Sequence, residues 1–321
     1  MDGAIRVGVV GLRRGMSIAS VCDAREDVRV TAVCDRNRNR AEAAATQLDA
    51  SACTDFDGFL DGPVDAVVIA KPPETHASLS AQALERGIHV LSEVPAVTSL
   101  EEAETLRAAA IGSEAIYMIA ENACFFSTMT TMQALVRSGR LGSVYYAEGE
   151  YIHDCRELFA DRDDGLGGGV KGVPTWRASL PPIHYTTHEL GPLLMMTDDP
   201  MIEAVALDAG THTARSYGAS AIEAALFRTL SGAVVKLLCG FAVEREPAFH
   251  FLSLYGSDGS IETDRYRPYE GLKAHFADVP NSGGLIEIPV SHHRPGARAV
   301  VAGGHGTSEY DMVDRFVSRI R

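Results

Sequence analysis

Residues 5–15 read IRVGVVGLRRG and residues 28–35 read VRVTAVCD, and these two stretches decide the fold. The first is an apolar run that turns through Gly11 and Gly15, and the second is an apolar run that ends on Asp35. A strand, a glycine turn, a helix and a second strand ending in an acid form the βαβ unit that holds a dinucleotide. Small residues let a pyrophosphate approach backbone N–H groups at the helix start, and the acid accepts the ribose hydroxyls. The pattern therefore predicts a nicotinamide cofactor.

The glycine turn departs from the G-x-G-x-x-G pattern at two points. Arg13 replaces the middle glycine, and the last spacing is one residue short. The alternative is an ordinary α/β turn in which glycine supplies a positive φ. Asp35 favours the dinucleotide site, because it lies about 20 residues past the last glycine, where that pattern places its acid. The residues expected to contact the cofactor in the turn are Gly11, Leu12, Arg13, Arg14 and Gly15.

Three arginines after Asp35 bear on which cofactor is bound. Arg36, Arg38 and Arg40 follow the acid closely. They could receive the 2′-phosphate of NADP, or they could form a solvated helix face, which is the commoner use of such a charge run. The acid at Asp35 therefore favours NAD, with Arg36 as a neighbouring cofactor contact.

Length and composition are those of an enzyme that acts on small molecules. The chain has 321 residues, 46% of them hydrophobic, which predicts two domains because one core rarely grows so large. No stretch approaches the roughly 20 apolar residues of a membrane span, and charged Asp2 and Arg6 take the place of a signal peptide. Six cysteines without a C-x-x-C pair predict reduced thiols. The formal net charge of -14 argues against nucleic acid. We expect a cytoplasmic protein without a membrane or nucleic-acid partner.

Two later strands of the expected parallel sheet end at prolines. The run Val64–Ala70 stops at Lys71-Pro72-Pro73, and His89–Leu91 leads into Ser92-Glu93-Val94-Pro95. Proline cannot donate a ladder hydrogen bond, so each strand ends there, at the edge where open α/β sheets bind ligands. We expect both ends to line one crevice. The cofactor-binding candidates at this edge are Lys71, Pro72, Pro73, His76, Glu93 and Val94.

The pattern changes beyond residue 122. A helix is expected over Phe126–Gly139, and strand-like runs follow it. Short turns such as Ser231-Gly232 join several of these runs, which favours antiparallel hairpins. The expected strands are Val144–Ile152, Ile202–Leu207, Ala221–Leu230, Ala233–Val243, Phe249–Tyr255 and Ser260–Asp264.

The ordered motifs VGVVGLRRG, VTAVCD, DAVVIAKPPETH and GIHVLSEVPAV resemble the Gfo/Idh/MocA oxidoreductases along nearly the whole chain. The resemblance implies an α/β protein with a Rossmann domain at residues 1–122, built on a doubly wound parallel sheet. Residues 123–321 would form an α+β domain whose large, open, mostly antiparallel sheet carries a sugar site on one face and pairs in homo-oligomers on the other. It also implies that Asn122 lies near the nicotinamide ribose, although Asn122 could instead cap a turn. Relatives continue beyond Arg321, which leaves a truncated or a naturally short second domain as alternatives.

Two positions depart from this family's usual acid/base set. Most of its dehydrogenases have Glu-Lys-Pro where this chain has Val94, and the lysine ammonium assists proton movement at the carbinol. The family also places an aspartate four residues before a site histidine, whereas this chain has His184 before His188. One explanation is a member that has lost catalysis. Another is that Lys71 supplies the ammonium from the neighbouring strand end.

A closer resemblance offers a third explanation. The segments Glu93-Val94-Pro95-Ala96, Glu121-Asn122-Ala123-Cys124, Tyr151-Ile152-His153-Asp154 and Tyr185-Thr186-Thr187-His188 are similar to the NAD-dependent α-N-acetylgalactosaminidases. Thr186 stands where those relatives have proline, and Glu189 where they have glycine. Their chemistry oxidises a sugar hydroxyl at C3, eliminates the C1 substituent, adds water and returns the hydride, so the cofactor is not consumed.

The candidate catalytic residues follow from this resemblance. Such a reaction needs a base near C2 and C3, which histidine and tyrosine can provide. We expect His188 and Tyr185 to act on the sugar, with His153, Asp154 and His184 supporting them. His184 and His188, at i and i+4, would share a helix face and could instead form a core contact or a metal pair, but no H-E-x-x-H pattern surrounds them and no metal is expected.

The sequence leaves three functions open. The first is an NAD(H)-dependent oxidoreductase that transfers a hydride between a sugar carbinol and nicotinamide. The second is a redox-neutral, NAD-dependent glycosidase. The third is an inactive regulator that binds NAD.

Overall fold

The computed structural model describes residues 3–161, 172–267, 269–280, 284–290 and 307–321. The chain divides into two compact units, and each is described by itself. Among the described residues, unit 1 comprises 3–122 and 307–321, and unit 2 comprises 123–161 and the described part of 172–290. None of the helices in these ranges is long and apolar enough to cross a membrane.

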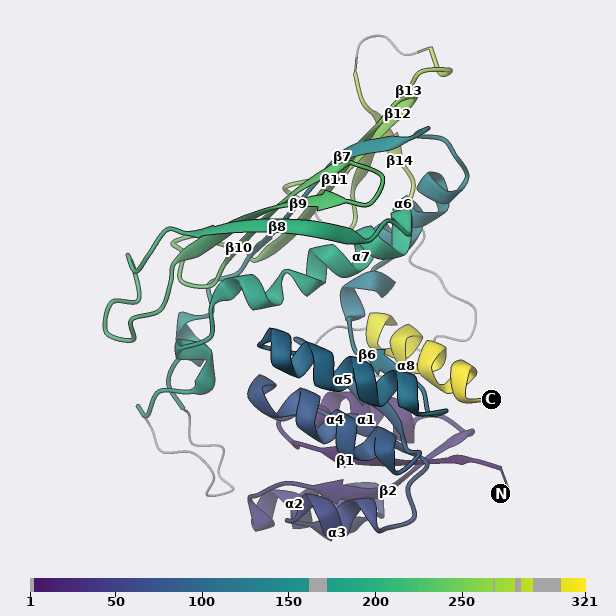
Figure 1. Cartoon of the computed structure of the whole chain (residues 1–321), viewed down its shortest axis with the longest axis vertical. Coiled ribbons are helices and arrows are strands. Elements are labelled where there is room, and N and C mark those ends of the chain that lie inside the picture. The colour runs from purple at the N-terminus through teal and green to yellow at the C-terminus, as the bar shows by residue number, and fades with distance from the viewer. Residues whose placement is uncertain (1–2, 162–171, 268, 281–283, 291–306) are drawn as a thin grey trace. The chain divides into compact units, whose positions relative to one another are not determined.

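Unit 1 is built on a six-stranded parallel sheet in the order β3-β2-β1-β4-β5-β6 (Figure 1). The four residues of β4 are all buried, as expected of a parallel strand that is covered on both faces. The strand order reverses between β1 and β4, and open α/β sheets bind ligands at such a point, outside the carboxyl ends of the strands. The strands are β1 (Ile5–Val10), β2 (Val28–Cys34), β3 (Ser51–Cys53), β4 (Ala66–Ile69), β5 (His89–Ser92) and β6 (Tyr117–Ile119).

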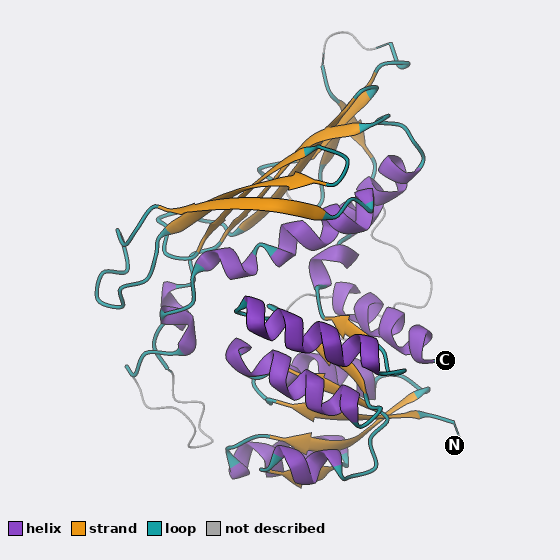
Figure 2. Cartoon of the chain, viewed as in Figure 1, coloured by secondary structure: helices purple, strands orange, loops and turns teal. Residues whose placement is uncertain are grey.

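Helices connect these strands in alternation (Figure 2). Side chains cap several of them: Asn37 accepts a hydrogen bond from the N–H of Arg40, and Ser99 accepts one from Glu102. Unit 1 also contains the first residue of the short turn η2 (Asn122–Phe125). Its helices are α1 (Gly15–Asp23), α2 (Arg38–Leu48), α3 (Phe56–Leu60), η1 (Pro73–Thr75), α4 (His76–Glu85), α5 (Leu100–Gly112) and α8 (Thr307–Ile320).

The C-terminal helix α8 belongs to unit 1, although the expected second domain ran from 123 to 321. Its apolar face, which includes Met312, Val313 and Phe316, is buried. Arg25, two residues after the end of α1, forms an ion pair with Asp314 at 2.9 Å. The amphipathic pattern of α8 therefore serves packing against α1, far away in sequence.

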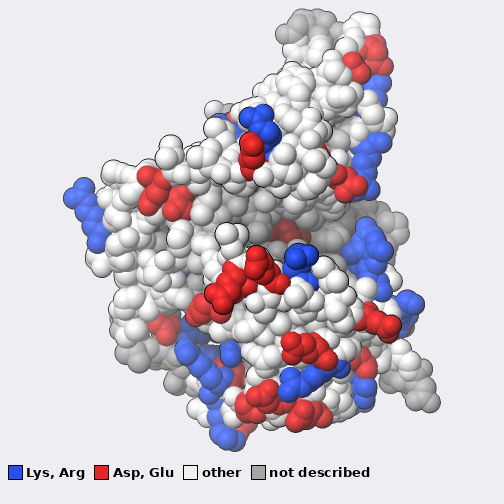
Figure 3. Space-filling model, in the orientation of Figure 1, with Lys and Arg blue, Asp and Glu red and all other residues white. Residues whose placement is uncertain are grey.

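Charges on the surface of unit 1 are mixed. On the face drawn in Figure 3, acidic and basic side chains lie next to one another over its helices. Exposed pairs include Arg86 with Asp57 at 3.3 Å and Arg38 with Glu42 at 3.8 Å. Exposed ion pairs of this kind contribute little to stability.

Unit 2 is built on an eight-stranded sheet in the order β14-β13-β12-β11-β7-β10-β9-β8. Its neighbours are antiparallel except for the central pair β7 and β10. The expected fold class is confirmed, and the sheet has two strands, β13 and β14, beyond the six expected. The strands are β7 (Val144–Ile152), β8 (Met201–Asp208), β9 (Ile222–Thr229), β10 (Val234–Gly240), β11 (Phe249–Gly256), β12 (Gly259–Thr263), β13 (Leu272–Phe276) and β14 (Ile286–Ile288).

Helices α6 and α7 cover one face of this sheet (Figure 1). Leu237, Leu252 and Leu254 point toward them and are almost fully buried together with Met129 of α6 and Leu193 of α7. The helical elements of unit 2 are α6 (Ser127–Arg137), η3 (Arg156–Leu158), η4 (Trp176–Ala178), η5 (Pro182–Tyr185) and α7 (Thr187–Thr197).

Candidate active site

The glycine turn of unit 1 lies tightly against the end of β4. Gly11 has φ +87°, and a Cβ built on it would lie 2.4 Å from the carbonyl oxygen of Ala70. A Cβ on Gly15 would itself meet Ala70 and Val9. Arg14, the residue before α1, makes no side-chain capping hydrogen bond. A glycine turn that leads into an uncapped helix start is the arrangement that binds phosphate, so these residues fit a dinucleotide. Arg13 is exposed, so the missing middle glycine does not prevent this geometry.

Asp35 joins the end of β2 to the glycine turn. Its carboxylate accepts hydrogen bonds from the backbone N–H groups of Leu12 at 3.0 Å and Asn37 at 2.9 Å. It also accepts one from the guanidinium of Arg40 at 2.9 Å. Arg40 is therefore held by Asp35, whereas Arg36 is exposed. The acid is fixed at the edge where a ribose would lie.

His76 connects the two proline-terminated strand ends. Its Nε2 lies 2.6 Å from the carbonyl oxygen of Lys71, and its Nδ1 lies 2.8 Å from that of Pro95. The side chain is buried, with 1% of the residue exposed. Pro73 and Val94 are buried, while Lys71 and Pro72 are partly exposed. The expected convergence of the two ends is therefore present, and His76 holds the loops together.

The side chain of Arg14 is paired with two carboxylates. It forms ion pairs with Glu93 after β5, at 2.8 Å, and with the fully buried Glu309 of α8. Burial lowers the pKa of the Arg14 guanidinium. The charges and hydrogen bonds of Glu93 and Glu309 together raise this pKa by more, so the net shift is upward. Arg14 therefore stays charged. Because its side chain is paired with these carboxylates, its backbone N–H is the group that could contact a cofactor. Asn122 is buried at the start of η2.

Unit 2 brings together an aromatic–histidine cluster, which we define as Tyr151, His153, Tyr185, His188, His250 and Tyr269. Tyr151 of β7 is its centre: its ring centroid lies 5.0 Å from that of His188 and its hydroxyl lies 3.1 Å from Nδ1 of His153. Tyr185 and His188 have ring centroids 5.7 Å apart. Three of the expected catalytic residues, His188, Tyr185 and His153, are thus neighbours on the helix-covered face of the sheet.

Burial sets the protonation of two members of this cluster. Burial is the main cause that raises the pKa of Tyr151 well above its ordinary value. Burial likewise lowers the pKa of His153, and nearby acids only partly offset it. A charged form is costly in a poorly solvated environment. Near pH 7 Tyr151 is therefore a neutral phenol and His153 a neutral imidazole.

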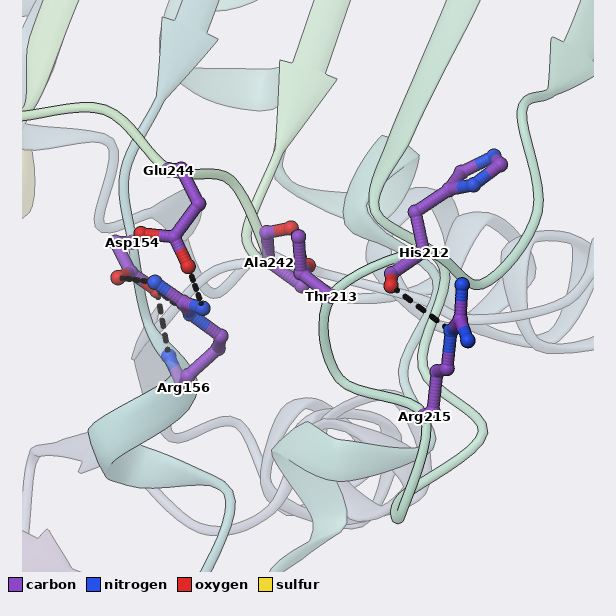
Figure 4. A network of polar contacts seen from close by, with 7 residues as sticks. All are labelled: Asp154, Arg156, His212, Thr213, Arg215, Ala242 and Glu244. Atoms are coloured by element: carbon purple, nitrogen blue, oxygen red, sulfur yellow. Dashed lines mark hydrogen bonds and ion pairs between the residues drawn. The ribbon is translucent and has the colours of Figure 1, made fainter.

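Asp154 is paired with Arg156 (Figure 4). Its carboxylate accepts hydrogen bonds from the guanidinium of Arg156 at 2.6 and 2.7 Å, and Arg156 also pairs with Glu244 at 2.5 Å. The hydrogen bond from Arg156 is the main cause that lowers the pKa of Asp154. Asp154 is therefore held by the guanidinium of Arg156, and its supporting role stays a prediction.

His184 and His188 do not share a helix. His184 lies in the short 3₁₀ turn η5, and His188 lies in the first turn of α7, which begins at Thr187. The i, i+4 expectation therefore does not apply. Within the described ranges, no group of three or more His, Cys, Asp or Glu side chains is placed to hold a metal ion.

Sequence reasoning did not propose Tyr151, His250 or Tyr269 of this cluster, nor Glu189, which contacts it. His250 of β11 lies opposite Tyr151 in the strand register, and their rings stack with centroids 4.4 Å apart. Glu189 of α7 contacts Nδ1 of His250 at 2.7 Å. The available signal for His250 was a histidine within the apolar strand FHFLSLYG. The signal for Glu189 was its position, where the similar glycosidases have glycine.

The parallel sheet of unit 1, with its glycine turn beside the strand ends, is the fold of a dinucleotide-binding Rossmann domain. Residues 5–121 match the family model described as "Oxidoreductase family, NAD-binding Rossmann fold". This chain therefore carries the NAD-binding Rossmann domain of the Gfo/Idh/MocA oxidoreductase family, which confirms the predicted resemblance and cofactor class for this domain.

Two curated relatives are similar in sequence. A "Glycosyl hydrolase family 109 protein" of Streptomyces filamentosus is 30% identical over 206 residues, which are 60% of this chain and 41% of that protein. A "dTDP-3,4-didehydro-2,6-dideoxy-alpha-D-glucose 3-reductase" of Saccharopolyspora spinosa is 28% identical over 83% of this chain and 76% of that protein. The chain thus spans less than half the length of the first relative.

A solved structure extends the likeness to the whole chain. An inositol dehydrogenase homolog from Azotobacter vinelandii, complexed with NADH and myo-inositol, matches with a TM-score of 0.77 at 20% identity. The match covers 100% of this chain and 86% of that one. At this identity the likeness establishes the fold, including the open sheet of unit 2.

Proposed function

We propose that this chain is an NAD(H)-dependent oxidoreductase that transfers a hydride between nicotinamide and a carbinol of a sugar or glycoside. Unit 1 would hold the cofactor and unit 2 the sugar. The observation that carries the proposal is the glycine turn at Gly11, which has room only for backbone against Ala70 and is joined to Asp35 through the N–H of Leu12. The bound cofactor would accept or return the hydride. Asp35 favours NAD over NADP.

The cofactor contacts are proposed along one edge of unit 1, at the carboxyl ends of its parallel strands. Gly11, Leu12 and Gly15 would offer backbone to the pyrophosphate, and Asp35 would accept the ribose hydroxyls. The loops held by His76, which contain Lys71 and Val94, would line the same edge. Asn122 would lie near the nicotinamide ribose.

The catalytic roles are proposed for the aromatic–histidine cluster. His188 and Tyr185 would exchange protons with the sugar, since the ordinary pKa of histidine is close to neutral. His153 is held by the hydroxyl of Tyr151 and would orient that ring. His184 and Asp154 would support the loops around the cluster, and Asp154 would do so through Arg156.

A redox-neutral glycosidase is the second candidate. It is favoured by Val94, a buried side chain without a transferable proton, together with the likeness to the Streptomyces filamentosus protein. In that reaction the sugar is oxidised, loses its C1 substituent, gains water and is reduced again. The cofactor would remain bound throughout.

We also propose that unit 2 pairs with a second copy of this chain through the uncovered face of its sheet. Val205 and Leu207 of β8 lie on one face of that strand and are 59% and 77% exposed. Leu226 of β9 lies opposite Val205 in the register and is 48% exposed. Adjacent exposed apolar side chains favour a protein contact, and sedimentation velocity measures it. The six free cysteines support a cytoplasmic location.

The decisive experiment follows NADH absorbance and product release together. The purified protein is first denatured and its supernatant assayed for nicotinamide, and NAD binding is measured by calorimetry. The protein is then incubated with free sugars and polyols plus NAD, with oxidised sugars plus NADH, and with nitrophenyl glycosides that include the α-N-acetylgalactosaminide.

Each proposed activity has its own result. A net oxidoreductase forms or consumes NADH in proportion to product. A redox-neutral glycosidase releases nitrophenol without accumulating NADH. NAD binding with neither reaction identifies the inactive regulator, and a protein that neither contains nor binds nicotinamide contradicts all three.

A further inference from the structure

A buried carboxylate and a buried imidazole form a pair inside unit 2. Oε1 of Glu189 lies 2.7 Å from Nδ1 of His250. Glu189 is 2% exposed and His250 is 7% exposed. Burying a charged carboxylate is costly unless it is hydrogen-bonded or paired, so this contact is a specific feature of the chain.

The backbone makes room for this pair. Glu189 lies in the first turn of α7, where the helix dipole favours a negative charge. Below it on β7 is Gly149, and a Cβ built there would lie 2.6 Å from the Cβ of Glu189. Gly149 therefore lets α7 approach the sheet closely. His250 comes from β11, where the register sets it against Tyr151.

The contact fixes the tautomer of the imidazole. An ionised carboxylate is only an acceptor, so Nδ1 of His250 must carry the proton that lies between them. In the neutral ring Nε2 is then the proton acceptor. The ring cannot turn freely, because it stacks on Tyr151 with an interplanar angle of 10° and meets the ring of His188 edge-on at 5.5 Å.

Other titratable groups surround the pair. Burial is the main cause that raises the pKa of both Tyr151 and Tyr269, and the charge of Glu189 raises each further. Burial followed by Glu189 likewise raises the pKa of the Cys239 thiol on β10. These three groups stay protonated at neutral pH.

We infer that Glu189 is a positioning residue that holds His250 as a proton acceptor of the sugar site. The inference rests on the proposed function. With NAD bound, the nicotinamide would take the hydride of the carbinol C–H with its two electrons, and Nε2 of His250 would take the O–H proton. The reverse reaction would return both. His250 would thus be the proton acceptor that oxidation of the carbinol requires.

Five variants of the whole 321-residue chain test the inference: E189Q, E189D, H250Q, G149A and the control E150Q. E189Q keeps the size of the side chain and removes its charge, H250Q removes the imidazole, and G149A displaces Glu189 without removing it. The matched control is E150Q. Glu150 is also a buried carboxylate, but it lies on β7, on the face of the sheet that α7 does not cover, and it pairs with Arg265 at 2.8 Å.

The expected results separate proton transfer from structure. E189Q and H250Q should lower kcat by about 10²-fold, the usual contribution of a general acid or base, with KM and NAD affinity nearly unchanged. In E189Q the remaining activity should also shift its pH profile toward lower pH, since the carboxylate no longer stabilises the protonated ring. The kcat of G149A should lie between those of these variants and the wild type. E189D should have a higher kcat than E189Q, because it keeps a carboxylate. E150Q should keep the wild-type kcat and pH profile.

A second measurement does not depend on turnover. Nitrogen-15 NMR of labelled imidazoles, with the His250 signal identified by its loss in H250Q, reports which nitrogen carries the proton. A proton on Nε2 of the neutral ring, or an unchanged pH profile in a folded E189Q, would overturn the inference while leaving the proposed function intact. A wild-type protein without NAD binding or turnover would overturn both.

Discussion

The two units use their sheets differently. In unit 1 the candidate cofactor edge is made mostly of backbone: the turn at Gly11, the N–H of Leu12 and the carbonyls that hold His76. In unit 2 the candidate sugar site is made of side chains that stand on one face of an open sheet. The first kind of site depends on local chain geometry, and the second depends on which distant strands become neighbours.

This difference explains where function can change. The backbone of unit 1 must keep its course to hold a dinucleotide, so a substitution there has to preserve φ and space. The face of unit 2 accepts new side chains wherever the opposing element leaves room, as Gly149 does for Glu189. The chemistry can therefore vary in unit 2 while the cofactor edge stays the same.

The substitution G11A tests most directly whether the cofactor edge of unit 1 is made of backbone. The new methyl would require a positive φ and would lie 2.4 Å from a backbone carbonyl oxygen. We expect NAD binding to weaken by about 3 kcal/mol or more, which calorimetry measures. The control is G87A, because Gly87 also has a positive φ but has open space around its Cβ position. Equal NAD affinities in the two variants would contradict a backbone-made cofactor edge.

The corresponding test in unit 2 is H188Q. Loss of a proton-transferring imidazole should lower kcat by about 10²-fold and leave NAD affinity unchanged, as steady-state kinetics and calorimetry would show. His212, drawn in Figure 4, provides the control, since H212Q alters an exposed histidine of the same unit. Nε2 of this ring lies 2.8 Å from the carbonyl oxygen of Ala209. A wild-type kcat in H188Q would remove His188 from the catalytic set.

Exchange of Asp35 for asparagine tests the side chain that is proposed to accept the ribose hydroxyls. D35N loses a charged acceptor for the ribose, which corresponds to a loss of about 1.5–3 kcal/mol in NAD affinity. NADP affinity should fall less, because the negative charge no longer repels its 2′-phosphate. Titration with both cofactors measures the ratio, and D57N, at an exposed acid paired with Arg86, is the control. An unchanged ratio would place the ribose elsewhere.

The smallest expected effect is the pH dependence that His153 gives to stability. Burial holds its pKa below the ordinary value of about 6.5. As pH falls below that value the unfolded chain binds more protons than the folded chain, so the free energy of unfolding decreases until the folded pKa is passed. Urea unfolding between pH 5 and 7 should show a weaker decrease in H153Q. A steeper decrease in H153Q would contradict the direction of this shift.

The sequence predicted much of the fold because its signals were local. The strands β1, β2 and β7 have the bounds expected from their apolar runs, and the prolines after β4 and β5 mark true strand ends. The short strands β13 and β14 were missed, since five and three residues carry little periodicity. In unit 2 the sequence also brought forward Tyr185, His153 and His188.

The contacts of these residues could not be predicted from their spacing in the sequence. Asp154 follows His153 in the chain but is held by Arg156, and His184 lies outside the helix that carries His188. Sequence spacing predicts contacts only inside a regular element. His153 and Asp154 both lie beyond the end of β7, and His184 and His188 lie in different elements.

By itself, the sequence determined the βαβ unit, the acid at Asp35 and the change from a parallel to a mostly antiparallel sheet, because glycine, proline and apolar periodicity act over a few residues. Only the tertiary structure decided that Glu189, 61 positions before His250, would contact it. That contact requires the β7–β11 register and the close approach of α7 at Gly149. Such long-range pairing is fixed by packing of the whole unit, and no short stretch of sequence encodes it.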